Sequence, residues 1–170
     1  MLNSEFSIVQ KEGLSLSNKA LLGLLQEALS KGNSLRLRVK GFSMFPCIMH
    51  NDIVTVSPLN DSLPYIGLAV AFLHPYTNKL VIHRVIRQIQ DKVMIKGDCV
   101  FSSDGLIPHK NILGIVTKIE RNNRLLNFSI SYGKSLALFF NKTNIFSLLL
   151  YMGKRFPYVI RQTIKQKFFI

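Results

Sequence analysis

A series of short apolar runs, separated by clusters of turn-forming residues, constrains the fold of this 170-residue chain more than any other feature. Runs of this length between Asn, Asp, Ser, Gly and Pro clusters predict β-strands joined by turns. We expect strands at residues 35–39, 53–57, 68–73, 80–89, 92–95 and 112–120. Closely spaced strands predict a mainly β fold of the α+β class, a coiled sheet or small irregular barrel.

One amphipathic helix is expected before the strands, at residues 15–32. Its apolar residues recur three and four positions apart, Ser17 can cap its start and Gly32 can end it. A helix-turn-helix DNA-binding module needs further helices, and the chain has no room for them before the strands. Residues 1–13 are polar, which predicts neither a signal-peptide core nor an N-terminal membrane anchor.

Length and composition indicate one domain with an appendage. A chain of 170 residues that is 48% hydrophobic can build one substantial core. We therefore expect an N-terminal helical lead-in at 1–34, a β domain at 35–128 and a C-terminal segment at 129–170.

The C-terminal segment is apolar and basic. The formal net charge is +13, and all nine acidic residues lie at or before Glu120. Polar residues 141–144 interrupt the apolar runs. The segment therefore contains no uninterrupted run of about 18 apolar residues, the length that a membrane-spanning helix needs. The charge asymmetry suggests an anionic partner, either lipid headgroups or nucleic acid phosphate. The mixture of basic and apolar residues predicts a peripheral membrane anchor, and without such an anchor we expect a cytoplasmic protein. No nucleic-acid partner is expected. The alternative is a helical hairpin that packs on its own domain or on a partner protein.

The two cysteines, Cys47 and Cys99, have no CxxC or histidine spacing typical of a zinc site. We expect each to be a small apolar filler, and a disulfide between them stays open. No metal or cofactor is expected.

A serine lies in the turn between the first two expected strands. Gly41 breaks the first strand, and Ser43 begins the turn 43–46. A serine at such a turn is well placed as a nucleophile, although most loop serines only satisfy the backbone. A nucleophilic serine needs a base to take its proton.

His83 is the candidate base, because it interrupts the apolar run 80–86 and a buried imidazole needs a partner. The alternative is an ordinary core or surface histidine. Asp98 or Asp104 could orient the imidazole, or could be turn-capping residues. The other three histidines are expected at the surface: His50, His74 and His109.

The chain resembles the type I signal peptidase family over residues 35–124. The resemblance is carried by boxes in the family's order: Gly41-Phe42-Ser43-Met44-Phe45-Pro46, Asn51-Asp52-Ile53-Val54, Val70-Ala71-Phe72, His83-Arg84-Val85, Lys96-Gly97-Asp98 and Leu113-Gly114-Ile115-Val116. That family shares its β-rich catalytic fold with self-cleaving repressors of the DNA-damage response. Bacterial-type members and repressors have a lysine where this chain has His83, whereas the endoplasmic reticulum and archaeal type has a histidine.

The resemblance implies a serine endopeptidase that processes signal peptides, or another membrane-proximal peptide, after small residues. It implies Ser43 as nucleophile, His83 as general base and then acid, and Asp104 as the orienting group. Asp98, with the box residues Gly41, Met44 and Pro46, would support the site, and Arg84 would be structural.

The chain departs from the family's pattern around the serine. Gly41 stands where signal peptidases often have a hydroxyl residue, and Asn51 stands where they usually have glycine. The alternatives are a self-cleaving regulatory protein and a non-catalytic relative that binds an extended peptide as an added strand.

Overall fold

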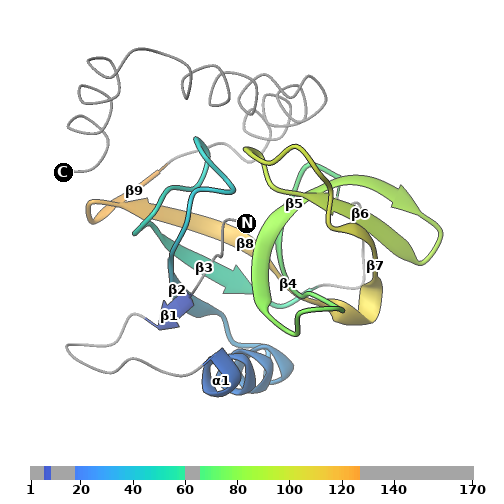
Figure 1. Cartoon of the computed structure of the whole chain (residues 1–170). Helices are drawn as coiled ribbons and strands as arrows, with labels where there is room; N and C mark the ends of the chain where they lie inside the picture. Colours follow the sequence, from blue (N-terminus) through green and yellow to red (C-terminus); the bar gives the residue numbers. More distant parts are fainter. Residues whose placement is uncertain (1–5, 9–17, 60–65, 127–170) are drawn as a thin grey trace, which may run out of the picture.

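The computed structural model describes residues 6–8, 18–59 and 66–126, and this part of the chain is mainly β (Figure 1). It contains one α-helix, α1 (Asn18–Ser30), a 3-10 turn (His109–Asn111) and a set of antiparallel strands. The strands are β1 (Phe6–Ile8), β2 (Leu35–Val39), β3 (Ile53–Ser57), β4 (Ala69–Leu73), β5 (Leu80–Ile89), β6 (Lys92–Lys96), β7 (Gly105–Pro108), β8 (Ile112–Arg121) and β9 (Arg124–Leu125).

The strands form one curled sheet in the order β1-β2-β3-β8-β4-β5-β6-β7, with β9 paired to β8. Strand β8 comes late in the chain but lies between β3 and β4, so it joins the half β1–β3 to the half β4–β7 (Figure 1). The curl brings the β2–β3 loop to the β6–β7 loop. There the N–H of Cys99 donates to the carbonyl of Ser43 at 2.8 Å.

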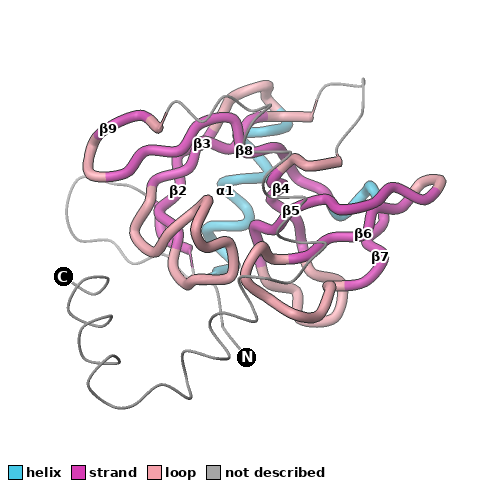
Figure 2. The backbone as a smooth tube through the Cα atoms, turned by 90° about the horizontal axis from the view of Figure 1, so that it is seen from above, coloured by secondary structure: helices cyan, strands magenta, loops and turns pink. Residues whose placement is uncertain are grey.

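Two hydrophobic clusters form the core, and strand β4 contributes to both. Its residues alternate between them: Ala69 and Ala71 belong to the first cluster, Val70 and Phe72 to the second. Because successive side chains of a strand point to opposite faces, a strand buried on both faces has this pattern. Helix α1 lies against the strands (Figure 2). Its leucines Leu21, Leu25 and Leu29 belong to the first cluster, so the helix and the sheet share this core.

The predicted mainly β fold and the six predicted strands are confirmed, with ends that differ by at most one residue. Strands β1, β7 and β9 were not predicted. Each has two to four residues, and β7 contains Gly105 and Pro108, which disfavour a strand assignment from sequence. The predicted helix is α1, and its proposed cap Ser17 lies outside the described residues.

No helix in the described ranges is both long and apolar enough to cross a membrane. The predicted membrane-binding segment 129–170 lies outside those ranges.

Candidate active site

The serine loop is closed at its neck by two backbone hydrogen bonds. The N–H of Val39 donates to the carbonyl of Asp52, and the N–H of Asn51 donates to the carbonyl of Val39, both at 2.8 Å. Asn51 has a φ of 70°, a left-handed conformation that Asn tolerates better than most residues. This conformation gives a physical reason for Asn at a position where the resembling family usually has glycine.

A tight turn holds Ser43 within this loop. The N–H of Phe45 donates to the carbonyl of Phe42 at 3.1 Å, and the N–H of Ile48 donates to the carbonyl of Met44 at 2.9 Å. Met44 and Ile48 are buried in the first cluster, which anchors the turn on the core. The predicted turn is therefore present, Ser43 is buried at its start, and the Phe45–Pro46 peptide is cis.

His83 and Asp104 form a hydrogen-bonded pair. Strand β5 places His83 opposite Val70 of β4, with the imidazole against the ring of Phe72. Nδ1 of His83 lies 2.7 Å from Oδ2 of Asp104, and the N–H of Asp104 donates to the carbonyl of Ile95 on the neighbouring strand β6. A carboxylate can only accept, so Nδ1 carries the proton and Nε2 of the neutral ring presents a lone pair.

The Nε2 atom of His83 faces the serine loop across Gly97. It is buried and has no hydrogen-bond partner among the described residues. A Cβ atom on Gly97 would lie 3.1 Å from this Nε2 and 2.8 Å from the carbonyl oxygen of Ser43. The backbone of Ser43 and the lone pair of His83 therefore border the same glycine. The described contacts include no hydrogen bond between the Ser43 hydroxyl and Nε2.

The second candidate carboxylate, Asp98, binds Arg84 instead of His83. Its two oxygens accept from Nε and Nη2 of Arg84 at 2.8 and 2.6 Å, and Nη1 of Arg84 donates to the carbonyl of Gly67 at 2.7 Å. Burial lowers the pKa of Arg84, but the hydrogen bonds and charge of Asp98 outweigh it, so the pKa is raised. Asp98 thereby fixes strand β5 directly beside His83.

The two cysteines lie near this ion pair as free thiols. Burial, reinforced by the charge of Asp98, raises the pKa of Cys47 and the pKa of Cys99 to about 11. Both are therefore protonated at neutral pH, and neither is an activated nucleophile.

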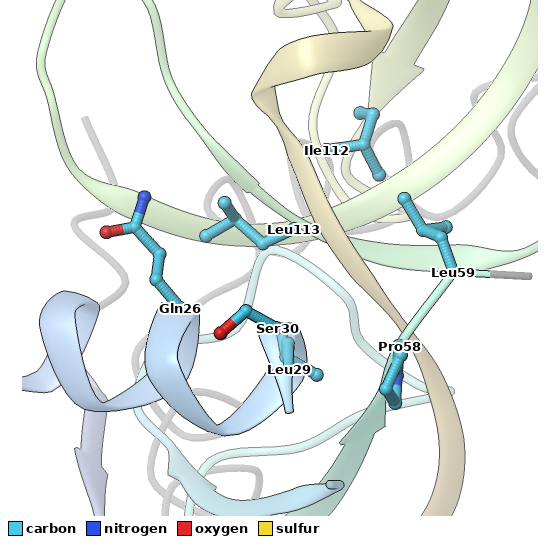
Figure 3. A pocket seen from close by; sticks show the side chains of 7 residues that line it. All are labelled: Gln26, Leu29, Ser30, Pro58, Leu59, Ile112 and Leu113. Atoms are coloured by element: carbon cyan, nitrogen blue, oxygen red, sulfur yellow. The ribbon is translucent and has the colours of Figure 1, made fainter. Parts of the chain in front are cut away.

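A surface hollow lies at the end of α1, away from these groups (Figure 3). Its lining comes from α1, the two residues that follow β3 and the start of β8: Gln26, Leu29, Ser30, Pro58, Leu59, Ile112 and Leu113. None of the residues proposed for chemistry lines it.

The structure brings together the loop of Ser43, His83 and Asp104, and places Asp98 beside them. The sequence analysis assigned no role to Gly97. Its place in the Lys96-Gly97-Asp98 box was the one sequence feature that could have pointed to a role in the site. No family model, curated protein or solved structure matches this chain.

Proposed function

We propose that this chain is a serine endopeptidase of the signal peptidase I type, with Ser43, His83 and Asp104 as its catalytic residues. One observation carries the proposal: Nδ1 of His83 is bonded to Asp104 while its buried Nε2 is unpartnered among the described residues and borders the Ser43 loop. A base oriented by a carboxylate, with its other nitrogen directed toward a serine, is the arrangement that acyl transfer requires.

The proposed reaction begins with attack of Ser43 Oγ on a peptide carbonyl while His83 Nε2 takes the hydroxyl proton. Asp104 stabilises the imidazolium that forms. The N–H groups of Ser43 and Met44, which donate to no other described residue, are available to the oxyanion. His83 then protonates the leaving amine, and water hydrolyses the acyl-enzyme with His83 again as base.

The proposed substrate is a preprotein or membrane-proximal peptide cleaved after a small residue, a preference that comes from the family resemblance. The basic, apolar segment 129–170 is proposed to contact an anionic membrane surface. The segment has seven Lys and Arg residues and no Asp or Glu, which supports that contact because anionic headgroups attract basic segments.

The test is cleavage of a peptide library in the presence of lipid or detergent, read by mass spectrometry. The wild-type chain is compared with Ser43→Ala, His83→Ala and the control Ser102→Ala, whose serine is exposed in the loop before Asp104. We expect cleavage after small residues by the wild type and the control alone. A folded wild type that cleaves nothing contradicts the peptidase.

The same samples distinguish the peptidase from the two alternative functions. A full-length chain that fragments itself, and stops doing so in Ser43→Ala, would indicate the self-cleaving regulator. Peptide binding without cleavage, unchanged in Ser43→Ala, would indicate a non-catalytic relative. Of the two, the peptide-binding reading has a structural observation in its favour, since the Ser43 hydroxyl makes no hydrogen bond to His83.

A further inference from the structure

His50 holds the two residues that precede Ser43. The N–H of Gly41 donates to Nδ1 of His50 at 3.1 Å, and the ring of Phe42 stacks on the imidazole with centroids 5.5 Å apart and planes at 27°. His50 is exposed, so core packing does not account for the position of its ring. Two different contacts, one polar and one aromatic, therefore join it to the segment leading into the serine.

The rest of the loop has other anchors. The hydrogen bonds of Val39 close its neck, and Met44 and Ile48 fix the turn on the core. Gly41 lies between these two anchors with a φ of 103°, a conformation open to glycine because it has no Cβ. His50 accepts the N–H of this glycine, so it contacts the loop at a point between the two anchors.

The chemistry of the contact defines the state of His50. A nitrogen that accepts a hydrogen bond from a backbone N–H carries no proton, so the neutral ring has its proton on Nε2. The accepted hydrogen bond and the stacked ring of Phe42 together restrain the backbone at Gly41 and Phe42.

We propose that His50 is a positioning residue of the nucleophile loop: it fixes the Gly41–Phe42 backbone so that Ser43 is presented toward His83. This inference rests on the proposed function and deepens it. Errors in orientation raise the barrier of the chemical step more than they weaken substrate binding, so His50 should act on kcat.

The test uses the full chain with three variants at this position. His50→Asn keeps an acceptor at the place of Nδ1, His50→Phe keeps the aromatic stack without the acceptor, and His50→Ala removes both. The control is His74→Ala, because His74 also accepts backbone N–H groups at Nδ1, from Tyr76 and Thr77, but in the β4–β5 turn. Peptide cleavage gives kcat and KM, and amide hydrogen exchange reports on Gly41.

We expect kcat to fall about tenfold or more in His50→Phe and His50→Ala with KM little changed, and to stay within about threefold in His50→Asn and His74→Ala. The Gly41 amide should be protected in the wild type and in His50→Asn, and exchange faster in the other two His50 variants. If the wild type is active and His50→Phe has the same kcat, the proposal is wrong.

The exchange measurement keeps this inference separate from the peptidase. If the wild type cleaves no peptide, the proposed function fails, and Gly41 exchange alone decides whether His50 fixes the loop. Equal exchange at Gly41 in all variants overturns the positioning role whether or not the chain is a peptidase.

Discussion

Arg84 and Asp98 are joined by two hydrogen bonds of 2.8 and 2.6 Å, and their side chains are 7% and 1% exposed. The pair ties strand β5 to the loop that follows β6. His83 precedes Arg84 on the strand, and Gly97 precedes Asp98 in the loop. The geometry of the site is therefore set by a buried ion pair that takes no part in the proposed chemistry.

Replacement of Asp98 by Asn should destabilise the fold strongly. The variant leaves the buried guanidinium of Arg84 without its counter-charge, and breaking a buried pair in this way costs about 3–5 kcal/mol. Urea unfolding followed by circular dichroism measures the loss. The control is Glu27→Gln, which removes an exposed i,i+4 pair with Lys31 and should change stability by less than about 0.5 kcal/mol. Similar values for the two variants would contradict this account of Asp98.

Asp104→Asn should preserve the fold and reduce cleavage. An amide can donate to Nδ1 of His83, which favours the tautomer with the proton on Nε2 and removes the base. Replacing the orienting carboxylate by an amide in such a triad lowers kcat by about 10⁴-fold. Steady-state cleavage with a matched melting curve checks this, and an active, folded Asp104→Asn chain would remove Asp104 from the mechanism.

Gly97→Ala should impair activity through steric conflict. The added methyl would lie 2.8 Å from the Ser43 carbonyl and 3.1 Å from His83 Nε2, so the loop or the ring must move. Overpacking of this kind costs about 1–3 kcal/mol. Gly23→Ala is the matched control, because its methyl meets open space in α1 and should stabilise the helix by about 1 kcal/mol. Cleavage rates and melting temperatures of both variants test the prediction. Unchanged cleavage by Gly97→Ala would refute it.

The buried thiols predict a loss of stability at alkaline pH. Their pKa in the folded chain is about 11, raised by burial from the usual 9.0. Well below pH 9 both thiols are protonated in the folded and in the unfolded chain, so their contribution to the free energy of unfolding is fully present. Between about pH 9 and 11 the unfolded chain releases protons that the folded chain keeps, so stability falls. The decline should be shallower in a Cys47→Ala/Cys99→Ala chain when unfolding free energy is measured against pH, and equal slopes would argue against the raised pKa values.

The longer strands were predictable because their apolar patterns and bounding turns are local properties of the sequence. Strand β5 is an example, since its ten residues match the predicted range. The short edge strand β7 was missed because a partner, β6, determines it more than its own composition does. The strand order was not predictable either, because the insertion of β8 between β3 and β4 depends on contacts distant in sequence.

At the candidate site, residue type and order predict which side chains to consider but do not choose between Asp98 and Asp104, and only the family resemblance favours Asp104. The structure separates them by their partners, since Asp104 bonds to His83 and Asp98 bonds to Arg84. His50 was expected to be an ordinary surface histidine. Its contact with Gly41 depends on the closure of the loop, which no local pattern reveals.

The central place of β8 has a consequence for the newly made chain. Ser43 belongs to the half of the sheet that ends at β3, whereas His83 and Asp104 belong to the half that begins at β4. Strand β8, which unites the halves, is synthesised after all three residues. The growing polypeptide therefore carries every group of the proposed triad before it contains the strand that joins the two halves of the sheet.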